Sequence, residues 1–243
     1  MPALPRRDAL DAVLFDAGGT LIELDYAFIA AQAELAGHRL ETEALRRAEG
    51  LARREIDRIA LQEGRLRGDD ESRRPSYFAM LLAAAGLALR HRAPLVAELE
   101  EEHTRSNLWR VAVRGAHATL ASLREQGLRL AVVSNADGRV ARLLEEVGLA
   151  AQLELIVDSH WEGVEKPDPA IFDRALGRLG VRAERACYVG DIYAIDVRGA
   201  RAAGLAPVLV DGVGAYSGLD CPHIASLDEL RAALAAGGAP APR

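Results

Sequence analysis

The sequence predicts an α/β protein built on a parallel β-sheet, and two features of its 243 residues support this prediction. After Gly115, short apolar segments alternate with segments of helical periodicity, and glycines separate many of them. This alternation is typical of β-α-β units, in which helices connect parallel strands. Residues 26–109 differ, because Ala, Leu, Arg and Glu recur there at helical spacing without a strand signal. We therefore predict a parallel-sheet core with helices on both faces and an all-helical insert after the first strand.

The first predicted strand is residues 12–15, Ala-Val-Leu-Phe, which ends at Asp16. An uninterrupted apolar run beside glycines is typical of a strand that is buried on both faces. Roughly four helices are expected in the insert that follows. The glycines and aspartates of residues 64–70 indicate a break, Pro75 indicates the first turn of a helix, and another helix is predicted after Pro94.

The second half of the chain contains the remaining strands and helices of the predicted core. Glycine follows most of the predicted helices, and it is a common residue where a helix ends. The small, proline-containing tail from Gly237 onward is expected to be disordered. The predicted strands are residues 130–133, 155–157, 187–189 and 207–210, and the predicted helices are residues 116–125, 139–147, 169–179, 195–203 and 227–235.

The charge balance of the chain argues against nucleic-acid binding. Acidic residues outnumber basic ones 36 to 30, the net charge is −6, and no long run of basic residues occurs. Of the basic residues, 29 are arginine and only Lys166 is lysine. Lys166 is therefore the only lysine available to any site in this chain.

The apolar segments and cysteines bear on the cellular compartment. The longest apolar stretch, residues 81–89, is far shorter than the ~20 residues that a transmembrane helix needs. The N-terminal segment lacks the apolar region of a signal peptide, and Cys187 and Cys221 form neither a disulfide scaffold nor a Cys-x-x-Cys site. We expect a cytoplasmic monomer or homodimer with neither a membrane nor a nucleic-acid partner, and a buried structural role for Cys187.

Polar residues follow four of the predicted strands directly or after a short loop. The carboxyl ends of parallel strands meet at one edge of a sheet, which is where ligands bind in this class of fold. We therefore expect these side chains to lie close together. Along the chain they are Asp16 and Thr20, then Ser134 and Asn135, then Lys166, and finally Asp191 and Asp196.

Such a group of residues is suited to phosphoryl transfer. Converging carboxylates repel one another unless a cation neutralises them, and oxygen ligands of this kind suit Mg²⁺. A carboxylate such as Asp16 is able to attack phosphorus, and a lysine and a hydroxyl suit the other phosphoryl oxygens. Gly19 and Thr20 belong to the glycine-rich turn after Asp16, whose backbone N–H groups are expected to point at the same anion.

Four short motifs resemble those of the haloacid dehalogenase superfamily, in the same order and at the strand ends. Residues 15–21, Phe-Asp-Ala-Gly-Gly-Thr-Leu, resemble the first motif, and residues 132–135, Val-Val-Ser-Asn, the second. Residues 164–172, Val-Glu-Lys-Pro-Asp-Pro-Ala-Ile-Phe, resemble the third, and residues 189–191, Val-Gly-Asp, with Asp196 the fourth. Each motif alone is weak, but four in order over nearly the whole chain are a strong signal.

The resemblance implies two domains. Residues 1–22 and 110–243 would form the Rossmann-like core of this superfamily. Residues 23–109 are similar to its C1-type cap, which closes over the active site and excludes water. The implied function is a hydrolase, and the implied partner is a small phosphorylated molecule.

The resemblance also implies roles for individual residues. Asp16 would be the nucleophile, Lys166 would hold it together with a phosphoryl oxygen, and Ser134 with the backbone N–H of Asn135 would bind the transferring group. For Ser134, a turn hydroxyl remains the alternative.

The implied cofactor is Mg²⁺. Its ligands would be Asp16, the backbone carbonyl of Gly18, Asp191 and Asp196, the last either directly or through a metal-bound water. A solvated acid on a helix remains the alternative interpretation of Asp196.

One departure from the superfamily concerns the first motif. Its phosphatase form is Asp-x-Asp, and the second aspartate protonates the leaving group. Gly18 takes that position here and has no side chain. General acid–base catalysis contributes about 10²–10⁴ in rate, so ordinary phosphomonoester turnover is in doubt. We predict a preference for leaving groups that need little protonation, such as acyl or aryl phosphates, unless a cap residue or water supplies the proton.

The sequence is compatible with three functional hypotheses. The first is a Mg²⁺-dependent phosphatase. The second is a 2-haloacid dehalogenase, which also lacks the second aspartate, but Asp191 and Asp196 argue against it because dehalogenases are metal-independent. The third is a protein that binds phosphate or Mg²⁺ with little or no turnover. Phosphonatase chemistry through a cap lysine is excluded, because residues 23–109 contain no lysine.

Overall fold

A computed structural model describes residues 2–63 and 76–236 of the chain. The break predicted at residues 64–70, the helix start at Pro75 and the disordered tail from Gly237 lie outside the described residues. The chain divides into two compact units, Met1–Glu23 with Arg110–Arg243, and Leu24–Trp109.

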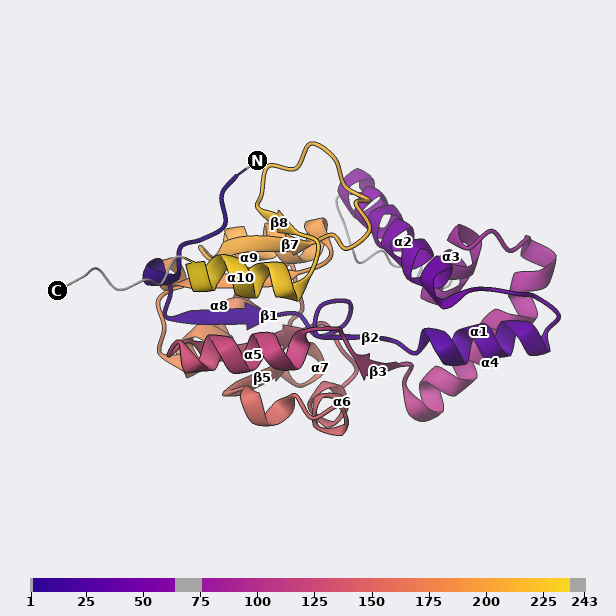
Figure 1. The fold of residues 1–243 in the computed structure, drawn as a ribbon, viewed down its shortest axis with the longest axis horizontal. Coiled ribbons are helices and arrows are strands. Elements are labelled where there is room, and N and C mark those ends of the chain that lie inside the picture. Colours follow the sequence, from indigo (N-terminus) through magenta and orange to yellow (C-terminus); the bar gives the residue numbers. More distant parts are fainter. Residues whose placement is uncertain (1, 64–75, 237–243) are drawn as a thin grey trace. The chain divides into compact units, whose positions relative to one another are not determined.

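A six-stranded sheet in the order β5-β4-β1-β6-β7-β8 forms the centre of the first unit (Figure 1). All of its strand pairs are parallel, which confirms the predicted fold class. The sequence did not indicate β8, because a strand of two residues shows no periodicity. The strands are β1 (Ala12–Phe15), β4 (Arg129–Ser134), β5 (Leu155–Asp158), β6 (Ala186–Gly190), β7 (Ala206–Val210) and β8 (His223–Ile224).

Helices cover both faces of this sheet. On one face, α8 and α9 pack against the alternate strand residues Leu14, Val133 and Tyr188. The intervening residues, such as Val13 and Phe15, point to the opposite face and are equally buried. Another pair of helices, α5 and α10, lie side by side (Figure 1). The helices of this unit are α5 (Ala116–Glu125), α6 (Val140–Glu146), α7 (Ser159–Glu162), α8 (Pro169–Leu179), α9 (Arg198–Ala202) and α10 (Leu227–Ala236).

The strand order places the predicted functional residues at one edge. Strand β1 lies between β4 and β6, so the strand order reverses at β1. In open parallel sheets, ligands bind at the carboxyl edge beside such a point. Phe15 pairs with Val132 on β4 and with Val189 on β6. The residues that follow these strands therefore converge.

The second unit is helical. Its helices are α1 (Tyr26–Leu35), α2 (Thr42–Glu63), α3 (Tyr77–Ala84) and α4 (Leu89–Ser106), and their apolar faces share one core. Ser76 caps α3 by accepting the Ala79 N–H at 3.2 Å. The prediction of a helix start after Pro94 was wrong, because α4 begins at Leu89 and contains this proline. No described helix is long and apolar enough to cross a membrane.

Two short strands lie at the boundary between the units. They are β2 (Ile22–Leu24) and β3 (Trp109–Ala112), which pair as a two-stranded sheet. The sequence did not indicate them, because three or four residues beside long helices carry little periodicity.

Candidate active site

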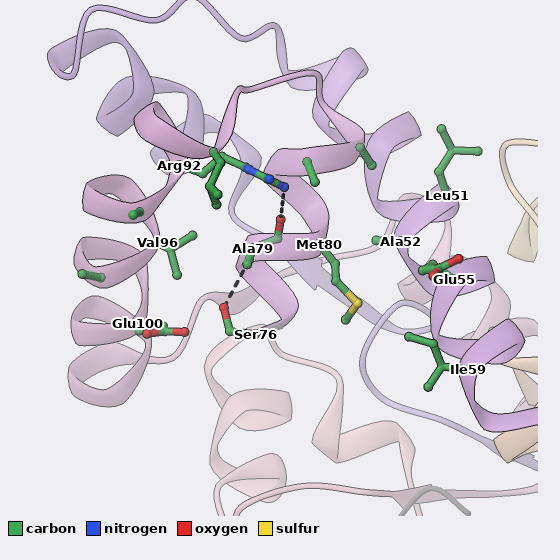
Figure 2. Close-up of a pocket in the computed structure, with 15 residues that line it drawn as sticks. Leu51, Ala52, Glu55, Ile59, Ser76, Ala79, Met80, Arg92, Val96 and Glu100 are labelled. Carbon is green, nitrogen blue, oxygen red and sulfur yellow. Dashed lines mark hydrogen bonds between the residues drawn. The ribbon is translucent and has the colours of Figure 1, made fainter. Parts of the chain in front are cut away.

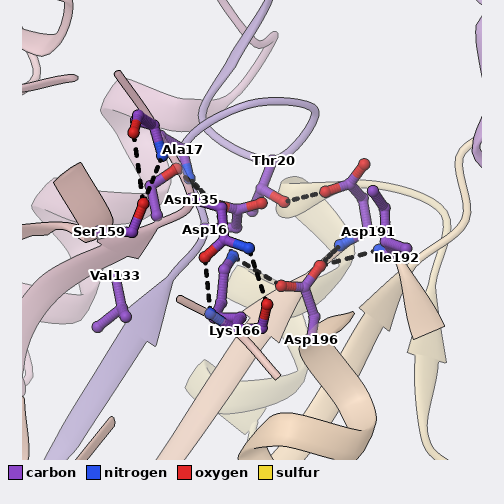
Figure 3. A network of polar contacts seen from close by, with 12 residues as sticks. Asp16, Ala17, Thr20, Val133, Asn135, Ser159, Lys166, Asp191, Ile192 and Asp196 are labelled. Carbon is purple, nitrogen blue, oxygen red and sulfur yellow. Dashed lines mark hydrogen bonds and ion pairs between the residues drawn. The ribbon is translucent and has the colours of Figure 1, made fainter. Parts of the chain in front are cut away.

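Asp16 is the first residue after β1, and three groups hold one of its carboxylate oxygens (Figure 3). Oδ1 accepts hydrogen bonds from the Ser134 hydroxyl at 2.8 Å and from the Ala17 N–H at 2.7 Å. Lys166 Nζ lies 2.9 Å from the same oxygen. The side chain is therefore fixed through Oδ1, and the only remaining oxygen is Oδ2.

Lys166 lies in the loop between α7 and α8, and its side chain is only 1% exposed. Besides Asp16, Nζ contacts Asp196 Oδ1 at 2.8 Å and the Tyr188 hydroxyl at 2.7 Å. The side chain of Asn135 holds the backbone of the same residue: its Oδ1 accepts the Lys166 N–H at 2.7 Å, and its Nδ2 donates to the Lys166 carbonyl at 2.9 Å. The loop and the ammonium are thus both anchored.

Asp191 and Asp196 come from the segment after β6. Asp196 belongs to a π-helical turn, Tyr193–Val197, which directs its side chain back toward the strand end. Its Oδ2 accepts the Asp191 N–H at 3.0 Å and the Ile192 N–H at 2.9 Å. Asp191 Oδ1 lies 3.5 Å from the Thr20 hydroxyl. The alternative of Asp196 as a solvated acid is therefore wrong, because this carboxylate is 1% exposed.

Asp16, Asp191 and Asp196 together form a cluster that fits a divalent cation. Each offers a carboxylate oxygen, and the three oxygens lie within 4.8 Å of one another. With all three ionised, three negative charges and the ammonium of Lys166 leave a net charge of −2. Mg²⁺ prefers a few carboxylate oxygens completed by water or phosphate, so this donor set and its charge suit it.

Burial and neighbouring charges set the protonation of these groups. Burial raises the pKa of Asp16, and the ammonium of Lys166 opposes this effect. Burial alone would lower the pKa of Lys166, but the carboxylates of Asp16 and Asp196 hold it above its ordinary value. Lys166 therefore stays charged at neutral pH. Burial also raises the pKa of Tyr188 well above its ordinary value, so its hydroxyl keeps its proton.

The backbone N–H groups of Gly19 and Thr20, in the turn after Asp16, donate hydrogen bonds within the turn and not toward a bound anion as predicted. Gly19 has a φ of 76°, which favours glycine, and its N–H donates to the Ile22 carbonyl at 2.7 Å. The Thr20 N–H donates to the Ala17 carbonyl at 3.3 Å. Both N–H groups are occupied within the turn, and the Thr20 hydroxyl faces Asp191.

Two groups of this site were not predicted from the sequence, the hydroxyl of Tyr188 and the side-chain amide of Asn135. A signal existed for Tyr188, because it lies in an otherwise apolar strand and a buried tyrosine hydroxyl needs a hydrogen-bond partner. No comparable signal existed for the amide of Asn135, since its partner is a backbone 31 residues away.

A separate cavity of about 920 Å³ lies within the helical unit, between α2, α3 and α4 (Figure 2). Its lining is largely apolar, with Leu51, Met80 and Val96 among the larger side chains. Arg92 also lines it and donates to the Ala79 carbonyl at 3.3 Å. No residue of the carboxylate cluster contributes to this lining.

The parallel sheet, with carboxylates and a buried lysine at its carboxyl edge, defines an α/β protein with a polar site at its strand ends. The family model of the haloacid dehalogenase-like hydrolases matches residues 10–204. The chain belongs to this family, as the four motifs predicted.

Similar proteins include both phosphatases and dehalogenases. Haloacid dehalogenase-like hydrolase domain-containing protein 3 of Bos taurus is 41% identical over 120 residues, which are 49% of this chain and 47% of the relative. Phosphoserine phosphatase of Thermus thermophilus is 44% identical over 97 residues, 40% of this chain and 39% of that protein. These matches thus span less than half of each relative.

A crystal structure of a dehalogenase with an intermediate complex has a TM-score of 0.64 at 24% identity, and the alignment covers 96% of this chain and 99% of that chain. This likeness establishes the fold and not the reaction.

Proposed function

We propose that this hydrolase is a Mg²⁺-dependent phosphatase that acts on a small phosphorylated molecule through an aspartyl-phosphate on Asp16. The observation that carries the proposal is the convergence of Asp16, Lys166, Asp191 and Asp196 at one edge of the sheet. The name of the phosphoserine phosphatase among its relatives supports phosphoryl transfer. Residues 23–109 are proposed as the cap domain.

Asp16 is the proposed nucleophile, and its surroundings suggest which oxygen reacts. Ser134, Ala17 and Lys166 all contact Oδ1. Oδ2 is then the oxygen that attacks phosphorus, forming a P–O bond while the bond to the leaving group breaks and its oxygen keeps the electron pair. Water afterwards attacks the same phosphorus, and the P–O bond to Asp16 breaks with its electron pair returning to Oδ2. The two protons of the water pass to the released phosphate and, through solvent, to the leaving oxygen.

The proposed metal ligands are Asp16, Asp191, Asp196 and the backbone carbonyl of Gly18. A bound Mg²⁺ would supply charge neutralisation that allows an anionic phosphoryl group to approach an anionic nucleophile. Asp196 contacts backbone N–H groups through Oδ2 and Lys166 through Oδ1. Its position is therefore set before any ligand binds, which reduces the reorganisation that binding requires.

Ser134, Lys166 and the backbone N–H of Asn135 are the proposed contacts of the transferring group. Ser134 is 4% exposed and reaches Asp16, so a phosphoryl group on Asp16 would lie beside its hydroxyl. Lys166 contributes its positive charge at the same place. Since Gly19 and Thr20 use their N–H groups within the turn, we propose that they shape it and that Thr20 orients Asp191.

Because Gly18 has no side chain, no carboxylic acid at this position is available to protonate the leaving group. The proposal therefore includes a substrate preference: acyl and aryl phosphates react faster than alkyl phosphates, because their leaving oxygens need little protonation. General acid catalysis is worth about 10²–10⁴, which sets the scale of the expected difference.

The test is a panel of phosphate esters with purified protein and Mg²⁺. We expect hydrolysis of p-nitrophenyl phosphate and acetyl phosphate, slow turnover of glycerol phosphate, and loss of activity in Asp16→Asn. Asp173→Asn is the matched control, because Asp173 is an exposed carboxylate on α8. Activity that survives Asp16→Asn would contradict the mechanism, and equal rates on aryl and alkyl esters would contradict the leaving-group preference.

Two further measurements address the other hypotheses. Chloride release from 2-chloropropionate without metal would favour a dehalogenase. Absence of turnover, together with Mg²⁺-dependent binding of vanadate, would favour a protein that binds phosphate without hydrolysing it.

A further inference from the structure

The hydroxyl of Tyr188 is a polar group in the hydrophobic core that the proposed reaction does not use. Tyr188 lies on β6 with 0% of its surface exposed, and its ring contacts Phe172 of α8 edge-on, with centroids 4.9 Å apart. The hydroxyl accepts a hydrogen bond from Lys166 Nζ at 2.7 Å and donates one to the Val133 carbonyl at 2.7 Å. It therefore connects the lysine to the end of β4.

The number of donors and acceptors sets the direction of these hydrogen bonds. A phenol has one proton, and that proton goes to the Val133 carbonyl, so the oxygen faces Lys166 only as an acceptor. An ammonium has three protons, and Lys166 Nζ has three oxygens within 2.9 Å: the Tyr188 hydroxyl, Asp196 Oδ1 and Asp16 Oδ1. Each proton of the ammonium thus has one protein acceptor.

This arrangement fixes the ammonium in position and in rotation. Two of its three acceptors are carboxylates that the proposed mechanism uses, and the third is neutral. Without the third acceptor, one N–H of a 1% exposed ammonium would lack a partner, which is costly in a buried site. The ammonium would then shift or rotate, and its contacts with Asp16 and Asp196 would change.

We propose that Tyr188 is a positioning residue of this active site, which acts through Lys166 to hold Asp16 and Asp196 in the geometry required for attack. The proposal rests on the proposed function for its effect on turnover. It also gives Lys166 a specific role, since its three protons contact the protein and its charge, rather than a free N–H, faces the incoming group.

The lone lysine makes a direct spectroscopic test possible. Protein labelled with [ζ-¹⁵N]lysine contains one labelled side chain, so the ammonium gives a single NMR signal. We expect a signal with slow proton exchange in the wild-type protein, because three oxygens hold the ammonium away from water. A rapidly exchanging wild-type ammonium would overturn the proposal without any variant.

The decisive variant is Tyr188→Phe, which keeps the ring and removes only the hydroxyl. We expect a shifted ¹⁵N signal with faster proton exchange, and a kcat for p-nitrophenyl phosphate that falls about 10- to 100-fold at unchanged KM. Tyr77→Phe is the control, because it removes a hydroxyl that donates to Glu49 at 2.7 Å within the helical unit. It should leave the lysine signal unchanged.

The outcomes separate this proposal from the proposed function. An unchanged lysine signal in Tyr188→Phe, or a changed signal with unchanged kcat, would overturn the positioning role. A purely structural role of Tyr188 predicts lower thermal stability with normal kcat and an unchanged ammonium signal. A wild-type protein without phosphatase activity would contradict the proposed function, whereas the NMR comparison would still decide whether the Tyr188 hydroxyl holds Lys166.

Discussion

A Cβ atom at Gly190 would lie 2.4 Å from the Cγ atom of Asp196, a separation that real side chains do not reach. The carboxylate of Asp196 occupies the space that a side chain at position 190 would need. From there it accepts the backbone N–H groups of Asp191 and Ile192. Gly190 has no positive φ, so glycine is required at this position for space and not for backbone conformation.

Gly190→Ala is therefore expected to displace Asp196 and disrupt its contact with Lys166. We expect loss of activity and a decrease of about 1–3 kcal/mol in the free energy of unfolding, as for other overpacked sites. Urea unfolding and a p-nitrophenyl phosphate assay measure the two effects.

The matched control for this substitution is Gly177→Ala. Gly177 lies in α8, and a Cβ there meets nothing within 4 Å. Alanine at this helical position should be neutral or stabilising by up to about 1 kcal/mol. Equal behaviour of the two variants would contradict the steric argument.

Lys166→Arg is expected to abolish activity while the protein remains folded. The guanidinium is larger, planar and forked, and it does not match three oxygens arranged around one nitrogen. Circular dichroism checks the fold, and turnover of an aryl phosphate checks the function. Arg142→Lys, at an exposed position on α6, is the reverse exchange and should change neither. A Lys166→Arg protein with normal turnover would show that position 166 needs only a positive charge.

Mg²⁺ is expected to raise the melting temperature of the protein. A ligand at 100 times its Kd stabilises the folded state by about 2.7 kcal/mol. Asp191→Asn removes a proposed ligand charge, so the thermal shift at a given Mg²⁺ concentration should decrease strongly. Asp173→Asn should retain the wild-type shift, and differential scanning fluorimetry measures all three proteins. A full shift in Asp191→Asn would place the cation elsewhere.

Both cysteines are expected to be unreactive in the folded protein. Burial raises the pKa of Cys187 to about 12 and that of Cys221 to about 11, so almost no thiolate exists at pH 8. Both thiols are also buried, which confirms the burial expected for Cys187. Ellman's reagent should detect no thiol in the native state and two after denaturation in guanidinium. Rapid labelling of the native protein would contradict this prediction.

Local sequence patterns were sufficient to predict the fold class. Alternating apolar and helical segments indicated the parallel sheet. Because the carboxyl ends of parallel strands meet at one edge, the sequence also predicted that Asp16, Lys166, Asp191 and Asp196 lie close together. The start of one helix was predicted wrongly, because α4 begins before Pro94. Strands β2, β3 and β8 were not predicted, because they are too short to show periodicity.

The sequence by itself determined the fold class, the family and the positions of the proposed nucleophile, the lysine and the acids, because short motifs and hydrophobic periodicity are properties of neighbouring residues. Only the tertiary structure decided how these groups contact one another. Ser134 reaches Asp16 across 118 residues, and Tyr188 reaches Lys166 across 22. Such contacts depend on strand order, register and side-chain direction, and one hydrogen bond between distant residues leaves no periodic trace in the sequence.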